Sequence, residues 1–378
     1  MVKQKSQLLA REPTLKVRPI VAHACHPCRD ALRRVGRALS LLVVLAVRVC
    51  REARPLHLPV WQMHSGMKEW LTLLREKGPF VELLEFDVED CFLNTPRQLV
   101  MEALAFWLQY PYSRRRVQCF AISKDGKAED YVGKPSSIHF WELPANFVVA
   151  AVRWELEHND LFEAASEDGK RSVLRQVKGL PIGGHLSAQL VELVALYREQ
   201  TAPWPAELAG RLSSRYRGNF FVALPPGAEV KMDGSAASQL QLLQMPVKPV
   251  ARGARMRCLE LWLTFSEGHA VRVLAFRTDA DRQGESNDVA SWPARDDPRT
   301  RMLLPSLLQG LVAKLRFSSG HGVEGFTATV RRMVTFVFAK GFPTSWWQRP
   351  FALELLRVGV PAGCLPRQFE QWLRRREL

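Results

Sequence analysis

The chain has 378 residues, of which 47% are hydrophobic, and its formal net charge at pH 7 is +15. This length and apolar content allow a substantial buried core in about two or three domains, and they exclude a chain that is disordered throughout. The excess of Lys and Arg favours a polyanionic partner such as a nucleic acid over a merely solvated basic surface, although charge alone defines no chemistry.

Nothing in the sequence indicates secretion or a membrane. Residues 1–11 are polar and basic without an apolar segment, so we expect no signal peptide. The seven cysteines are scattered and odd in number, which favours a reducing, intracellular compartment, either nuclear or cytoplasmic. The apolar run Leu39–Val47 is about half of a membrane span and is followed by Arg48, so we predict a buried helix and no membrane partner.

The N-terminal part is predicted to alternate between irregular and helical segments. Three prolines in residues 1–27 indicate extended or loop structure, and a long helix with a basic first half is expected over 28–50. A Pro-rich break at 55–59 precedes a short amphipathic helix over 66–77. The apolar face of that helix consists of Met67, Trp70, Leu71 and Leu74.

The middle of the chain mixes strands and helices. Residues 80–87 alternate as a strand does, and Pro96 marks the start of a helix over 97–109. The polar, Gly-containing stretch 112–135 is predicted to be a hairpin or an insertion, and residues 144–164 have a helical pattern.

A glycine-rich turn at 176–186 is followed by a predicted helix from Ser187 to about Arg198 and a strand pair at 213–223. Residues 225–255 are expected to form a loop. Further along the chain we predict strands at 257–265 and 270–276, a polar linker at 278–300, and a helical C-terminal third.

Three short segments occur in an order that carries more information than any of them alone. They are FDVEDCF at 86–92, QVKGLPIGGHLS at 176–187 and RYRGNFF at 215–221, and KVRPI at 16–20 precedes them. Together they resemble the palm and the preceding basic finger motif of reverse transcriptases. Among these, the chain resembles the Penelope-like enzymes, relatives of telomerase, and the resemblance extends from about residue 14 to about residue 320.

The resemblance implies an α+β right-hand polymerase, with fingers, an antiparallel-sheet palm and a helical thumb. The fingers would comprise residues 1–80, the palm 81–276 with a finger insertion at about 110–178, and the thumb or C-terminal region 277–378. Some of these elements carry a GIY-YIG endonuclease, whose signature is not found here, and the finger motif lies near the first residue. We therefore expect a shortened copy.

The resemblance also implies a metal site. Nucleotidyl transfer in this family uses two Mg²⁺ or Mn²⁺ ions, and such hard cations take carboxylate and carbonyl oxygens as ligands. Asp87 would be the first carboxylate ligand, and the carbonyl of Val88 would also reach the ion, whereas a structural role is expected for Asp90. The alternative for Asp87 is a helix N-cap or a solvated loop residue.

Further residues match positions that bind the incoming nucleotide. Lys16 and Arg18 would hold its triphosphate, and the alternative for them is ordinary surface charge. Phe92 would lie beneath the sugar and favour deoxynucleotides, or else be an ordinary core residue. The glycine-rich turn would contact template and nucleotide, or else simply join a strand to a helix. Its matching residues are Gln176, Gly179, Pro181 and Gly183.

The family pattern breaks at the hairpin tip. The family has Asp at the positions of Gly218 and Asn219, the first of which is the second catalytic metal ligand. Glycine offers no ligand, and Asn219 is a poor substitute for a carboxylate. We expect weakened metal binding and a rate loss of about a thousandfold or more. Rescue by Glu229 or Asp233 is not expected, because both lie in a loop beyond the hairpin.

Nucleic acid would contact the chain at Tyr216 and on a thumb helix, Leu303 to Arg316, through Lys314 and Arg316. The partners implied are an RNA template–DNA primer duplex and a dNTP. Two functions stay open, an RNA-directed DNA polymerase with an incomplete carboxylate set and a non-catalytic nucleic-acid-binding derivative. Zinc binding by the His and Cys residues of 23–28 is disfavoured, because six contiguous residues rarely surround one ion.

Overall fold

A computed structural model gives the protein in two compact units, each of which is described by itself. Among the residues described below, one unit includes 26–78 and 83–252, and the other includes 79–82 and the described segments after 252. The structure describes residues 26–112, 116–158, 161–165, 171–204, 208, 210–228, 247–258, 261–266, 269–274, 300–313, 330, 333–334, 337 and 341–357.

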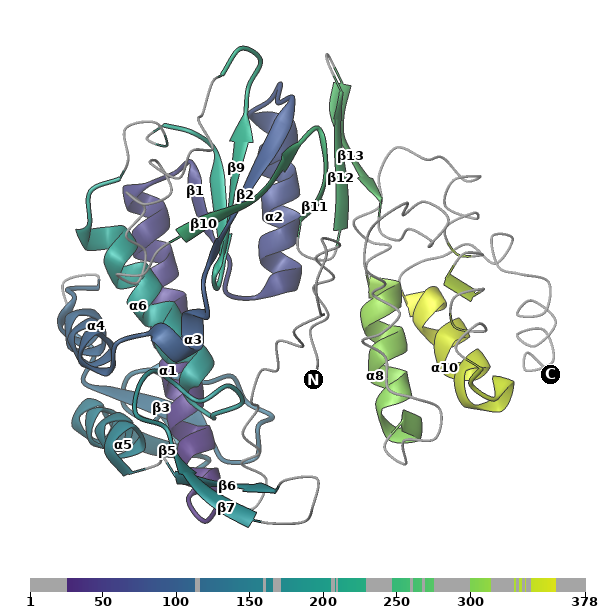
Figure 1. Ribbon diagram of the computed structural model, residues 1–378. Coiled ribbons are helices and arrows are strands. Elements are labelled where there is room, and N and C mark those ends of the chain that lie inside the picture. Colours follow the sequence, from purple (N-terminus) through teal and green to yellow (C-terminus); the bar gives the residue numbers. More distant parts are fainter. Residues whose placement is uncertain are drawn as a thin grey trace. The chain divides into compact units, whose positions relative to one another are not determined.

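The first unit contains a five-stranded sheet with the order β1-β8-β9-β2-β10 (Figure 1). β8 and β9 form an antiparallel hairpin, but β1 pairs with β8 in parallel. The sheet is therefore mixed, and the prediction of an antiparallel sheet is wrong at β1, which lies within the segment predicted as a Pro-rich break. The strands are β1 (His57–Pro59), β8 (Ser213–Tyr216), β9 (Asn219–Leu224), β2 (Glu82–Val88) and β10 (Val247–Gly253).

Helices α1, α4 and α6 pack against one another beside this sheet (Figure 1). The predicted helices over 28–50, 66–77 and 97–109 are confirmed as α1, α2 and α4, and the predicted apolar face of α2 is buried. The helices of this unit are α1 (Arg29–Ala53), α2 (Met63–Glu76), α3 (Cys91–Asn94), α4 (Arg97–Gln109), α5 (Ala145–His158) and α6 (Ser187–Thr201).

Alternate residues of β2 and β9 join the hydrophobic core that these helices complete. Successive side chains of a strand point to opposite faces, so Glu85 and Asp87 project from the other face of β2. Both are half-buried. The core-facing residues of the two strands are Leu84, Phe86, Val88, Phe220, Val222 and Leu224.

Three further predictions about secondary structure are wrong. The single strand predicted over 257–265 is two antiparallel strands, 255–258 and 261–266. The helix predicted over 144–164 ends at His158, and β6 (Leu161–Ala165) pairs with β7 (Arg171–Arg175) as an antiparallel hairpin. The next two residues in the sequence are Asn159 and Asp160, residue types that disfavour the continuation of a helix. The loop predicted over 225–255 contains β10, whose Pro249 argued against a strand. β10 lies at the sheet edge, where proline is tolerated.

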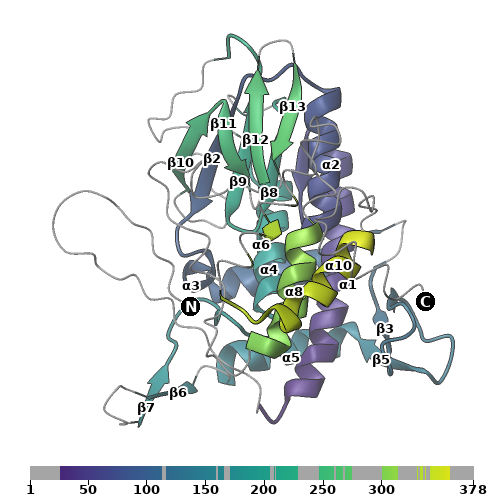
Figure 2. The same cartoon turned by 90° about the vertical axis from the view of Figure 1, so that its right-hand side faces the viewer.

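A second, three-stranded sheet of this unit has the order β4-β3-β5, within and after the predicted insertion at 112–135. The other unit has an antiparallel sheet of β11, β12 and β13 and the packed helices α8 and α10 (Figure 2). The bounds are β3 (Cys119–Ser123), β4 (Tyr131–Val132), β5 (Phe140–Pro144), β11 (Arg255–Cys258), β12 (Leu261–Ser266), β13 (His269–Leu274), α8 (Thr300–Ala313) and α10 (Thr344–Arg357).

No helix among the described residues has both the length and the apolar character needed to cross a lipid bilayer. The fingers, palm and thumb boundaries at residues 80 and 276 stay predictions.

Candidate functional site

Asp87 lies at the end of β2, on the face opposite the core. The chain turns away directly after it, because Asp90 adopts a left-handed conformation with φ of 45° and precedes α3. The carbonyl of Asp90 accepts a hydrogen bond from the backbone N–H of Asn94 at 3.0 Å. Asp90 therefore shapes the turn that leaves Asp87 at the strand end.

The β8–β9 hairpin is fixed to the same strand end. Its two-residue loop is Arg217-Gly218, between the paired residues Tyr216 and Asn219. The N–H of Val88 donates a hydrogen bond to the carbonyl of Gly218 at 2.9 Å. The structure thus brings together the first and third motifs, which are about 130 residues apart in the sequence.

A side chain at position 218 would begin next to Asp87. A Cβ placed on Gly218 would lie 3.5 Å from Asp87 Oδ1, 3.6 Å from the Val88 carbonyl oxygen and 3.3 Å from Cys91 Cβ. The left-handed residue of the loop is Arg217, with φ of 55°, and not Gly218. The backbone therefore admits an L-amino acid at 218, and only the Cys91 contact is tight.

The donor set does not fit a two-metal site. The oxygen atoms among the three atoms nearest to a Cβ at position 218 belong to the Asp87 carboxylate and the Val88 carbonyl. Within the described part of the chain, no group of three or more His, Cys, Asp or Glu side chains is arranged to hold a metal ion. Because hard divalent cations require several oxygen ligands, one carboxylate and one carbonyl are too few for two ions.

Asn219 is engaged with β2. Its amide Nδ2 donates to Glu85 Oε1 at 2.9 Å. Glu85 was not predicted as a site residue, although its position two residues before Asp87 puts both carboxylates on one face of the strand. Tyr216 is half-buried, and the Arg217 guanidinium carbon lies 5.3 Å from the centre of its ring.

The glycine-rich turn packs against α3, the short helix that follows Asp87 in the sequence. Gly179 has φ of 69°, and a Cβ there would lie 2.1 Å from the carbonyl oxygen of Leu93. The N–H of Leu180 donates to the carbonyl of Phe92 at 2.8 Å. Phe92 is half-buried and packs against the core. The second motif is thereby held beside the first.

Arg97 on α4 fixes the other end of this turn, and the sequence did not single it out. It donates from Nη2 to the carbonyl of Gln176 at 2.7 Å and from Nε to that of Gly179 at 3.3 Å. Pro181 is half-buried, and Gly183 is exposed with φ of 98°.

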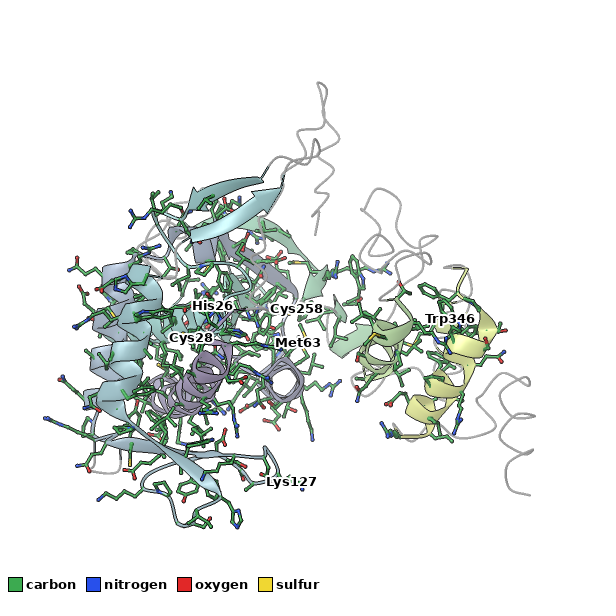
Figure 3. The ribbon with its side chains drawn as sticks, turned by 90° about the horizontal axis from the view of Figure 1, so that it is seen from below. His26, Cys28, Met63, Lys127, Cys258 and Trp346 are labelled. Atoms are coloured by element: carbon green, nitrogen blue, oxygen red, sulfur yellow. The ribbon has the colours of Figure 1, made fainter. Side chains whose placement is uncertain are left out.

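The remaining predicted residues lie elsewhere in the sequence. Lys16, Arg18, Lys314, Arg316, Glu229 and Asp233 lie outside the described residues. Of the 23–28 segment, His26 and Cys28 lie side by side (Figure 3), and the N–H of Cys28 donates to His26 Nδ1 at 3.1 Å.

A buried ion network lies next to the hairpin and was also missed. Arg215 on β8 donates from Nη2 and Nη1 to Glu192 at 2.7 and 3.1 Å, and from Nε and Nη2 to Glu199. His57 Nε2 lies 3.1 Å from Glu199 Oε1, and its Nδ1 lies 2.9 Å from the hydroxyl of Ser213. All five side chains are at most 3% exposed. The network joins β1, β8 and α6.

Burial and charge act differently on the two carboxyls. Burial raises the pKa of Glu199, but the charges of Arg215 and His57 and their hydrogen bonds outweigh it and lower this pKa to about 2. At Glu192 burial dominates and raises the pKa against the opposing charge of Arg215. Glu199 is therefore the more firmly ionised partner of Arg215.

No family model and no curated protein matches the sequence. Among solved structures, the chain is similar to apo telomerase from Candida tropicalis, with a TM-score of 0.45 and 12% identity over 88% of this chain and 54% of that chain. It is also similar to telomerase from Candida albicans in complex with a TWJ fragment of telomeric RNA, with a TM-score of 0.45 and 10% identity over 88% and 55%. The chain spans about half the length of these structures. A likeness of this degree does not define a function.

Proposed function

We propose that the chain is a reverse-transcriptase-like domain with impaired RNA-templated DNA synthesis, because the hairpin residue that should supply the second carboxylate is Gly218. One observation carries the proposal: a Cβ at position 218 would lie 3.5 Å from the nearer carboxylate oxygen of Asp87. The order of the three motifs and the docking of the glycine-rich turn beside Asp87 support it.

In this proposal Asp87 and the carbonyl of Val88 would be the groups that hold Mg²⁺ or Mn²⁺, and they would hold it weakly because they are too few for the two-metal site. The nucleotide is held by Phe92 and by the turn from Gln176 to Gly183, and Lys16 and Arg18 bind its triphosphate. The expected partners are an RNA template–DNA primer duplex, which Tyr216, Lys314 and Arg316 contact, and a dNTP.

A second candidate function is that of a non-catalytic nucleic-acid-binding protein derived from such a polymerase. The lack of a carboxylate side chain at position 218 and the net charge of +15 favour this alternative for the present chain. The two candidates share a nucleic-acid-binding surface and differ in whether primer extension remains.

Primer extension on an RNA template, with Mg²⁺ or Mn²⁺, tests the assignment. We expect little extension by the unmodified chain, and an increase of about a thousandfold for Gly218→Asp, which corresponds to about 4 kcal/mol of transition-state stabilisation. Gly218→Asn is the matched control, because its side chain has nearly the same size and lacks the charge.

Extension by Gly218→Asp but not by Gly218→Asn supports the carboxylate as the missing group. Robust extension by the unmodified chain excludes impairment. A folded Gly218→Asp variant that binds the duplex and does not extend it contradicts the assignment of the active site and leaves the non-catalytic function.

A further inference from the structure

The guanidinium of Arg215 makes one contact that ion pairing does not explain. Besides its bonds to Glu192 and Glu199, its Nη1 donates to the backbone carbonyl of Arg217 at 3.3 Å. Arg217 is the first residue of the hairpin loop and has a positive φ. The buried network is thus connected directly to the loop that presents position 218.

Arg217, whose carbonyl accepts this hydrogen bond, has a strained backbone conformation. A non-glycine residue in the left-handed region is unfavourable and persists only where its surroundings hold it. Arg215 is itself held on both sides, because two carboxylates of α6 accept hydrogen bonds from its planar fork. A rigid helix therefore fixes the loop through a single side chain.

The connection continues to Asp87. The residue after Arg217 is Gly218, whose carbonyl accepts the 2.9 Å hydrogen bond from Val88 N–H. Val88 is the neighbour of Asp87 at the end of β2. A continuous path of contacts thus runs from α6 through Arg215 and the loop to the strand end that carries the carboxylate.

We propose that Arg215 is a positioning residue: by holding the Arg217 carbonyl against α6, it fixes position 218 of the hairpin beside Asp87. What the fixed hairpin contributes to catalysis rests on the proposed function. The positioning of the hairpin by Arg215 does not depend on the proposed function, and the two claims are tested separately.

The test must separate positioning from folding. Removing Arg215 alone leaves Glu192 without its ion-pair partner and Glu199 with only His57, and can unfold the protein. Replacing the charged set together avoids this, because buried ion pairs exchanged for apolar residues of similar volume are often tolerated. The variant is Arg215→Met with Glu192→Leu and Glu199→Gln, in which the amide introduced at position 199 retains an acceptor for His57.

Hydrogen exchange of the Val88 amide is the deciding measurement. We expect the triple variant to melt within a few degrees of the unmodified chain, while this amide exchanges at least tenfold faster and the amides of α5 do not change. Arg37→Met is the matched control, because Arg37 also bonds a carboxylate, of Asp130, and a backbone carbonyl, of Ser123, in a different sheet region. It should leave Val88 exchange unchanged.

An unchanged Val88 exchange rate in the folded triple variant overturns the proposal. If the triple variant does not fold, Arg215→Lys replaces it, because lysine keeps the positive charge and lacks the planar guanidinium. The exchange rate of the Val88 amide is then measured in this variant. In the Gly218→Asp background, the triple variant should also lower kcat at least tenfold without changing KM for the dNTP. Absence of extension by Gly218→Asp itself would contradict the proposed function alone, because Val88 exchange still decides the role of Arg215.

Discussion

Gly179 and Gly218 are constrained in opposite ways. At Gly179, both the left-handed backbone and the 2.1 Å approach to the Leu93 carbonyl exclude a side chain. At Gly218, neither the backbone conformation nor the space near Asp87 requires glycine. Glycine at 179 is therefore a requirement of the fold, whereas glycine at 218 is not.

We predict that Gly179→Ala lowers the free energy of unfolding by about 4 kcal/mol or more, because a backbone atom cannot move away as a flexible side chain can. Urea unfolding monitored by tryptophan fluorescence measures it. Gly126→Ala is the control, since Gly126 has a similar φ of 71° with no atom within 4 Å of the added Cβ. Gly126→Ala should lower the free energy of unfolding by only about 1 kcal/mol. Equal losses at both positions would contradict the close-packing argument.

At the level of elements, the buried charges that connect α6 to β8 make stability depend on pH. The folded-state pKa of Glu199, about 2, lies below its ordinary value of 4.5. The ionised carboxylate therefore stabilises the fold above about pH 4.5, and this contribution is lost as the pH falls toward 2. Its size is on the order of 3 kcal/mol.

Glu199→Gln should consequently destabilise the protein at pH 7 and make little difference near pH 2. Comparing the free energy of unfolding of the variant and the unmodified chain at both pH values isolates Glu199 from Glu192, whose raised pKa acts in the other direction. Glu102→Gln on the exposed face of α4 is the control and should change stability by less than about 0.5 kcal/mol at pH 7. A destabilisation by Glu199→Gln that does not depend on pH would contradict the ionised state.

Helices and central strands of this chain are predictable because each has a strong local pattern. Pro96 before a helical repeat and the apolar face of α2 are examples. The parallel pairing of β1 with β8 joins residues more than 150 positions apart, which no local pattern encodes. The strand β10 was missed because Pro249 is acceptable only at a sheet edge, and edge position is a property of the finished sheet.

The candidate site was predictable where motifs lie in order and unpredictable where partners come from other elements. Asp87 and position 218 could be paired before the structure was known. The bonds of Glu85 to Asn219 and of Arg97 to the turn depend on tertiary contacts. One signal was available for the ion network: Glu192 and Glu199 are seven residues apart in an apolar helix, which puts both on one buried face.

At the scale of the whole molecule, the charge of +15 should dominate nucleic-acid binding. We predict that affinity for an RNA–DNA duplex falls linearly on a log–log plot against salt, with a slope of about −0.9 per phosphate contact. Fluorescence anisotropy at several KCl concentrations measures it. Gly218→Asp, which changes the formal net charge by only one, should have nearly the same slope. Salt-independent binding, or no binding at low salt, would contradict a nucleic-acid partner.

The two outer strands of the five-stranded sheet each contain a proline, Pro59 in β1 and Pro249 in β10. A proline lacks the N–H that a further strand would need as a donor, so neither border offers a complete ladder to a strand from another copy. Both borders thus resist sheet extension between molecules, which guards a basic, strand-rich protein against edge-to-edge aggregation during folding.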